Sequence, residues 1–268
     1  MVLSIDDCPA VAATLSCRVG GLRVHFIAMS ITLADAYLKT ARAKKHLDSL
    51  GEELRIFAES KPHRFSTERD VENQRYIVRV KIGQPPDSFP LIAGDFFSCL
   101  RSSLDHLVWS LAKLRRTYPL HTQFPILDEP DGKAIRNCTS GVPTEARKII
   151  ESLQPYRKGN AMRSHFLWQL HTLSIVDKHR RLATRGDATI ANFPDFPRRY
   201  LHLLEFDNAG VVSAPLHLES KMRLDPHGIY NVFFGDPIEG VEVDVDGLNR
   251  MYEFVTNNVI PRFTRFFK

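Results

Sequence analysis

The sequence lacks the features that mark several common classes of protein. Its longest apolar runs, such as the one at residues 11–15, are far too short to cross a bilayer, so we expect no transmembrane segment. It has no block of five or more like charges, no internal repeat and no low-complexity tract. A Walker loop, a GxGxxG fingerprint after a strand and a GxSxG elbow are also missing. These absences argue against a membrane protein, a nucleotide-binding enzyme of the common types and an α/β-hydrolase.

Cysteine is scarce, and its positions show no pattern. The cysteines form no CxxC pair, and one of them falls within an apolar helical stretch. Scattered thiols in a chain of this size are typical of a reduced intracellular protein, and not of a disulfide framework or a zinc site. We therefore predict a cytoplasmic protein that uses no metal and no other cofactor. The cysteines are Cys8, Cys17, Cys99 and Cys138.

Length, composition and charge are those of an ordinary globular protein. The 268 residues suffice for one large domain or two small ones with a real core. Hydrophobic residues make up 43% of the chain and charged residues 25%, which rules out the composition of a disordered chain. The net charge of +5 and the pI of about 9.0 favour an anionic partner, and RNA is the partner we consider.

Residues 1–28 differ from the rest of the sequence. They carry acids near the start, a proline and a Gly-Gly pair, and they show no sustained periodicity. A secretory signal needs a basic start followed by an unbroken apolar core, and this segment has neither. We therefore expect a flexible N-terminal extension over 1–28, with the folded part beginning near Met29.

Three later segments carry apolar residues at helical spacing and are predicted to be long helices. In the second, Leu104 and Leu111 lie at the centre of a regular apolar stripe. Pro62 closes the first, because proline cannot continue a helix. The predicted ranges are 31–59, 93–115 and 161–182.

Strand patterns lie between and after these helices. Apolar and basic residues alternate over 74–82, which predicts a half-buried strand. Short β-like runs separated by turn residues over 200–245 predict antiparallel hairpins, and a helix kinked or restarted at Pro261 closes the chain. The chain is therefore predicted to be an α+β protein with a single domain over 29–268, formed by a helical core (29–183) and a sheet with its closing helix (184–268).

The stretch LRSSLDHLVW at 100–109 places charged residues beside the apolar stripe of the second helix. At 100° per residue, Arg101 lies on the flank of the stripe, whereas Asp105 and Trp109 lie well round from it and His106 further still. Arg101 and Asp105 are four residues apart and can pair. Because a tryptophan rarely faces water without reason, we expect this face to meet another helix or a second copy of the chain in a homodimer.

A second stretch, LSIVDKHRRL at 173–182, resembles the first in mixing apolar and charged residues. Asp177 continues the apolar stripe of the third helix, so its carboxylate needs a partner, for which Arg101, Arg180 and Arg181 are candidates. The two helices could bring several polar residues into one cluster, with Arg180 and Arg181 in support. Its expected members are Arg101, Asp105, His106, Asp177 and His179.

The residues RSSLDH at 101–106 resemble the Arg-x4-His motif of HEPN-type helical ribonucleases. Members of that family are dimerising helical bundles that cut RNA without a metal ion. The resemblance implies that His106 is the acid–base group and that Arg101 holds the phosphate, a role that suits an arginine. Asp105, which lies between them, completes the candidate catalytic set. We therefore hypothesise a metal-independent endoribonuclease, of toxin or phage-defence type.

Two other interpretations remain open. The charged residues can instead be braces in a non-catalytic helical interaction or structural protein, since i,i+4 ion pairs stabilise very many helices. Alternatively, Asp105, His106, Asp177 and His179 have the ligand types of a metal-dependent hydrolase. The two motifs together are also similar to uncharacterised bacterial and phage proteins of this length, and that similarity implies no function.

Overall fold

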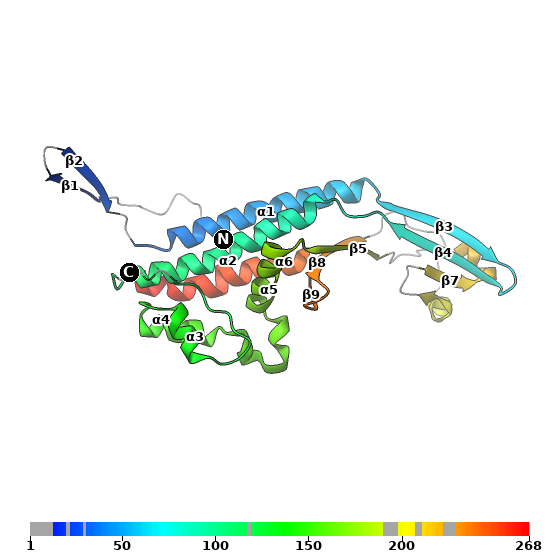
Figure 1. Cartoon of the computed structure of the whole chain (residues 1–268). Helices are drawn as coiled ribbons and strands as arrows, with labels where there is room; N and C mark the ends of the chain where they lie inside the picture. The colour runs from blue at the N-terminus through cyan, green and yellow to red at the C-terminus, as the bar shows by residue number, and fades with distance from the viewer. Residues whose placement is uncertain are drawn as a thin grey trace.

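The computed structural model describes residues 13–19, 22–28, 31–116, 119, 121–189, 198–206, 211–221 and 229–267. They form helices and antiparallel sheets, so the predicted α+β class is confirmed. Figure 1 shows an elongated molecule in which the helices make up the central body and a sheet extends beyond one end. Within the described ranges, no helix is long and apolar enough to cross a membrane.

Two long helices, α1 (Ala34–Glu59) and α2 (Ser88–Lys113), lie side by side and antiparallel (Figure 1). α2 begins five residues before its predicted start, because Pro90 falls in the first turn, where the backbone N–H groups have no partner within the helix. The buried positions of α1 recur every three or four residues and form a single stripe toward α2. They are Ala36, Thr40, Ala43, Leu47 and Leu50.

The third predicted helix is shorter than expected. α5 spans Phe166–His179, and the preceding residues form a 3-10 helix, η2 (Pro155–Ser164). His165 has extended backbone between them, and its Nδ1 accepts a hydrogen bond from the N–H of Leu167 at 3.1 Å. Histidine is not among the usual N-capping residues, so the start of α5 was not visible in the pattern. The short helices α3 (Gly132–Cys138) and α4 (Thr144–Ser152) lie in the connection from α2 to η2.

The closing helix is confirmed, and it changes type along its length. α6 (Val245–Glu253) is followed by a π-helical segment, η5 (Phe254–Val259), and a 3-10 segment, η6 (Ile260–Phe267). Pro261 has no backbone N–H to donate to the preceding turn, so the α-helical hydrogen-bond pattern cannot continue through it. The predicted interruption at Pro261 therefore takes the form of a change in helix type.

The strands form two larger sheets. One has the order β3 (His63–Asp70), β4 (Arg75–Ile82), β7 (Val211–Pro215) and β6 (Glu205–Phe206), and the other the order β5 (Ala183–Thr189), β8 (Ile229–Asp236) and β9 (Val241–Asp244). All pairs are antiparallel. The strand predicted over 74–82 is β4. Part of the predicted range 200–245 is helical instead, as the 3-10 helices η3 (Arg198–Leu203) and η4 (Leu216–Lys221).

Pairing between β4 and β7 crosses the expected boundary between a helical core and a later sheet. The main core contains the helices together with residues of β8 and β9, among them Phe234 and Val243. The sheet of β3, β4, β7 and β6 has a small core of its own, which contains Val78, Val212 and Ala214. The described residues therefore form two hydrophobic clusters, and each contains residues from both halves of the chain.

An antiparallel hairpin occupies part of the segment for which we expected a flexible extension. β1 (Ala13–Val19) pairs with β2 (Leu22–Ala28), from Ala13 opposite Ala28 to Val19 opposite Leu22. The other residues of 1–28 lie outside the described ranges. Leu15 and Cys17 alternate with Ser16 and Arg18 in β1, so a strand pattern was present in the sequence and the expectation of a flexible extension overlooked it.

Candidate functional site

Arg101 and Asp105 of α2 both bind the backbone of Phe124. Arg101 Nη2 donates to the carbonyl oxygen of Phe124 at 2.8 Å, and the N–H of Phe124 donates to Asp105 Oδ1 at 2.8 Å. The two side chains also pair with each other, with 2.5 Å between Arg101 Nη1 and Asp105 Oδ1. Arg101 is only 7% exposed. The predicted i,i+4 pair is therefore present, and it extends to a residue 19 positions after Asp105.

The segment that these residues hold is buried without being helix or strand. Phe124 is fully buried, Ile126 is 7% exposed, and their backbone groups cannot rely on water. Gln154, just after α4, binds the same segment: its Nε2 donates to the carbonyl oxygen of Pro125 at 2.9 Å, and its Oε1 accepts from the N–H of Leu127 at 3.0 Å. Polar side chains from α2 and from Gln154 after α4 thus bind the backbone N–H and C=O groups of a buried irregular connection, which have to be hydrogen-bonded because they are buried.

Gln154 was not found by sequence reasoning. It is 1% exposed, yet it stands between the apolar end of α4 and Pro155, where a polar residue is ordinarily read as part of a surface turn. Its role depends on the path of residues 125–127, which no local pattern reveals. The predicted cluster therefore omitted a residue that contacts the same segment as Arg101.

His171 of α5 is a second polar residue that the sequence did not single out. Burial lowers the pKa of its imidazole to about 4, and the positive charge of Arg101 acts in the same direction, whereas Asp128 and Asp105 oppose it. Its Nδ1 is buried and has no hydrogen-bond partner among the described residues. His171 is therefore neutral near pH 7 and is poorly suited to donate a proton. The sequence held one indication of this burial: His171 lies within a helix that is apolar on two sides.

His106 and Trp109 lie on the partly exposed side of α2. Arg101 and His106 are five residues apart, which places them about 140° apart around an ideal helix. Arg101 is buried against Phe124, whereas His106 is half-buried. Trp109 is also half-buried, and Lys113 Nζ lies 6.0 Å from its ring centroid. The arginine and the histidine of the motif thus do not share one face.

The second motif connects α5 to two other elements. Arg180 Nε donates to Asp236 Oδ2 in the β8–β9 turn at 2.8 Å, and Arg181 Nη2 lies 2.5 Å from Oδ1 of Asp87, the residue before α2. Arg181 was one of three candidate partners for Asp177, and it pairs with Asp87 instead. His179 is exposed in the last turn of α5.

Asp177 lies against α2 at Gly94, far from the first motif. Gly94 and Asp105 are eleven residues apart on α2, which corresponds to about 16 Å along the helix axis. Burial raises the pKa of the Asp177 carboxyl, and the neighbouring Asp95 raises it further. The five residues expected in one cluster are therefore not brought together: Asp177 contacts α2 away from the first motif, and His179 is exposed.

The residues proposed as metal ligands do not come together. No group of three or more His, Cys, Asp or Glu side chains in the described ranges could hold a metal ion. Asp177 of α5 contacts α2 at Gly94, about 16 Å along the helix axis from Asp105. Adjacent residues such as Asp105 and His106 point about 100° apart on a helix. The geometry does not favour the metal-dependent hydrolase.

Two pockets lie away from the first motif. One, of about 270 Å³, lies between α1 and the start of α6, and the other, of about 520 Å³, is lined by residues of β5, β8 and β9. Neither is lined by Arg101, Asp105 or His106. The candidate catalytic residues therefore do not open into either of these cavities.

Comparisons with known proteins add no relative: no protein-family model matches the chain, and neither the curated proteins nor the solved structures gave a match. The likeness to HEPN-type ribonucleases therefore depends on the residues 101–106 alone.

Proposed function

We propose that this protein is a non-catalytic interaction protein whose charged motifs hold its own elements together. One observation carries the proposal: each arginine of the two motifs donates from a helix, or from the residues that end it, to a different segment of the chain. Arg101 binds the connection at Phe124, and the other two bind the β8–β9 turn and the start of α2. The three are Arg101, Arg180 and Arg181.

The main argument against catalysis is that the guanidinium of Arg101 is already bound to groups of the protein itself. A phosphate-binding arginine needs its guanidinium free toward the substrate. Here one terminal nitrogen pairs with Asp105, the other donates to the Phe124 carbonyl, and the side chain is 9% exposed. Binding a phosphate would take the guanidinium away from the buried Phe124 carbonyl and from the Asp105 carboxylate, which is energetically costly.

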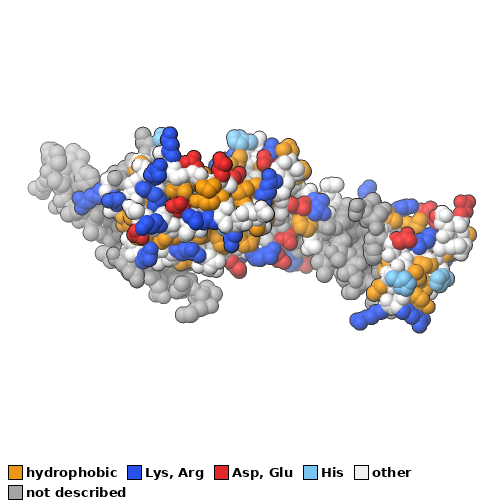
Figure 2. Space-filling model, turned by 90° about the horizontal axis from the view of Figure 1, so that it is seen from below, with side chains coloured by type: hydrophobic (Ala, Val, Ile, Leu, Met, Phe, Trp, Pro, Cys, Tyr) orange, Lys and Arg blue, Asp and Glu red, His pale blue; other side chains and the backbone are white. Residues whose placement is uncertain are grey.

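The surface offers places for a partner to bind. On the face of the helical body seen in Figure 2, hydrophobic side chains lie between groups of Lys and Arg. Separately, Leu38 near the start of α1 and Leu91 near the start of α2 are 67% and 62% exposed. Because the cysteines show no disulfide pattern, we place this activity in the cytosol.

RNA cleavage by a homodimer is the second candidate. It is favoured by His106 and Asp105, which are adjacent and both partly exposed on α2, in a chain with a net charge of +5. In this alternative His106 acts as the acid–base group, RNA is the partner, and the face with Asp105 and Trp109 forms the dimer contact.

An RNA-cleavage assay combined with thermal melting separates the two. The interaction protein predicts no cleavage by the wild type, and a lower melting temperature for Arg101→Ala. The ribonuclease predicts cleavage that is lost in His106→Ala at an unchanged melting temperature. Cleavage with that mutational signature would overturn our proposal.

A further inference from the structure

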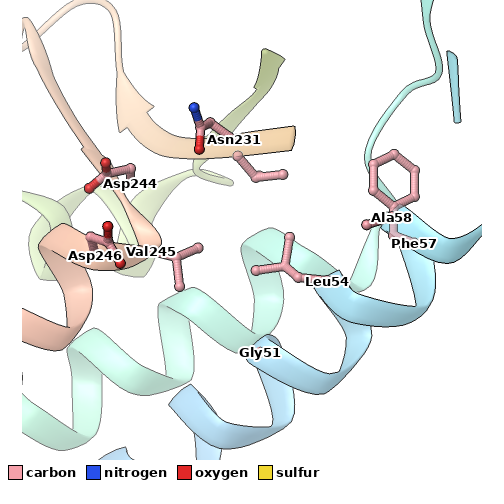
Figure 3. Close-up of a pocket in the computed structure, with 9 residues that line it drawn as sticks. Gly51, Leu54, Phe57, Ala58, Asn231, Asp244, Val245 and Asp246 are labelled. Carbon is pink, nitrogen blue, oxygen red and sulfur yellow. The ribbon is translucent and has the colours of Figure 1, made fainter. Parts of the chain in front are cut away.

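A pocket of about 270 Å³ separates α1 from the corner where β9 leads into α6 (Figure 3). Leu54 and Phe57 of α1 line one side, as Figure 3 shows, while Asn231, Asp244 and Asp246 line the other. The α1 side is therefore apolar and aromatic, and the opposite side carries two carboxylates and an amide beside the apolar side chains of Val232 and Val245.

The acidic wall is held in place by the start of α6. Asp244 Oδ1 accepts a hydrogen bond from the N–H of Gly247 at 2.7 Å, which caps the helix and orients this carboxylate. Asp246 in the first turn is exposed. Among the described residues that line the pocket there is no lysine, arginine or histidine.

On the α1 side, Gly51 also lines the pocket. A Cβ placed on Gly51 would meet no atom within 4 Å. Glycine lowers helix stability relative to alanine, so its presence in the middle of α1 has no local advantage. The absent side chain leaves room for a group that enters the pocket.

We propose that this pocket binds an arginine side chain of a partner polypeptide. A guanidinium is planar and weakly hydrated and pairs with carboxylates, while the methylene groups of an arginine pack on apolar side chains, so an arginine matches Asp244 and Asp246 beside Val245 and Leu54 (Figure 3). The volume is slightly below the roughly 300–1,000 Å³ of small-molecule sites, which fits one long side chain better than a larger ligand. The inference rests on the proposed interaction function, since it assigns the chemistry of the partner.

The test is an NMR titration of the full chain with Nα-acetyl-arginine methylamide. The neutral isostere, Nα-acetyl-citrulline methylamide, and the corresponding lysine derivative are the comparison probes. We expect the arginine probe to shift the resonances of Gly51, Leu54 and Asn231 in a saturable way, with at least tenfold weaker binding of citrulline. Added salt should weaken the binding, because the interaction is between charges at a partly exposed site.

Two substitutions at Gly51 form a matched pair. Gly51→Leu fills the pocket and should abolish binding, whereas Gly51→Ala makes a similar change to the helix and should retain it. Asp246→Asn should weaken binding at least tenfold without removing a helix cap. Melting temperatures confirm that the variants are folded.

Three results would overturn the inference: no saturable shift with the arginine probe, equal binding of citrulline, or equal binding by the two Gly51 variants. RNA cleavage dependent on His106 would remove the proposed function and leave the titration result standing, so the two failures can be told apart.

Discussion

The carboxylate of Asp177 packs directly on Gly94. A Cβ at position 94 would overlap the Oδ1, Cγ and Oδ2 atoms of Asp177, so the carboxylate takes this position only because residue 94 has no side chain. The motif LSIVDKHRRL is therefore fitted to the surface of α2, and its acid occupies a space that glycine leaves open.

Gly94→Ala should lower the free energy of unfolding by about 1–2 kcal/mol, because the added methyl group forces Asp177 to move. This loss exceeds the gain of alanine over glycine in a helix. Urea unfolding of the two proteins measures the difference.

The control for this substitution is Gly51→Ala, where the new methyl group meets no atom within 4 Å. It should stabilise α1 by about 0.5–1 kcal/mol. In addition, Asp177→Ala should relieve most of the cost of Gly94→Ala, as a double-mutant cycle would show. Independent effects at the two positions would contradict the close contact.

Arg101→Ala should destabilise the protein by about 2–4 kcal/mol, because Asp105 and the Phe124 carbonyl both lose a buried partner. Lys148→Ala is a suitable control, since Lys148 pairs with Glu145 at the surface and should contribute at most about 0.5 kcal/mol. Chemical denaturation provides both values. Equal stability of the two variants would show that Arg101 is not a brace.

His171 should make the protein sensitive to acid. Its pKa is about 4 in the folded protein and 6.5 in the unfolded chain. Between these values the unfolded state binds more protons, so the free energy of unfolding falls as the pH falls from 6.5 toward 4, and His171 has no such effect above pH 6.5. His171→Phe should flatten this part of the profile, as melting temperatures measured from pH 4 to 8 would reveal. A variant that keeps the wild-type slope would assign the acid sensitivity to other groups.

At the β8–β9 turn, Asp236→Ala should lower the melting temperature more than Arg180→Ala. Asp236 accepts hydrogen bonds from the N–H groups of Ile238 and Glu239 as well as from Arg180, so its removal frees three donors. Loss of Arg180 leaves the two bonds within the turn intact. Thermal unfolding of both variants tests the order, and the reverse order would show that the ion pair dominates.

The relation between prediction and structure differs from element to element. The apolar stripe of α2 and the alternation of β4 were visible because helix and strand periods are local properties. The start of α5 at Phe166 was not visible in the sequence, because its cap is His165. The 3-10 helices at 198–203 and 216–221, where strands were predicted, were not visible either. Such ends depend on caps and turns rather than on periodicity.

The sequence by itself determined the α+β class, the two long helices and the pairing of Arg101 with Asp105, since residues four apart on a helix are always neighbours. Only the tertiary structure decided what the pair does. The buried segment at Phe124 has no regular hydrogen bonds of its own, so it needs Arg101, Asp105 and Gln154, and their meeting depends on how distant segments pack. For the same reason Asp177 lies on Gly94 and not with the first motif: helix packing, and not spacing along the chain, places it there.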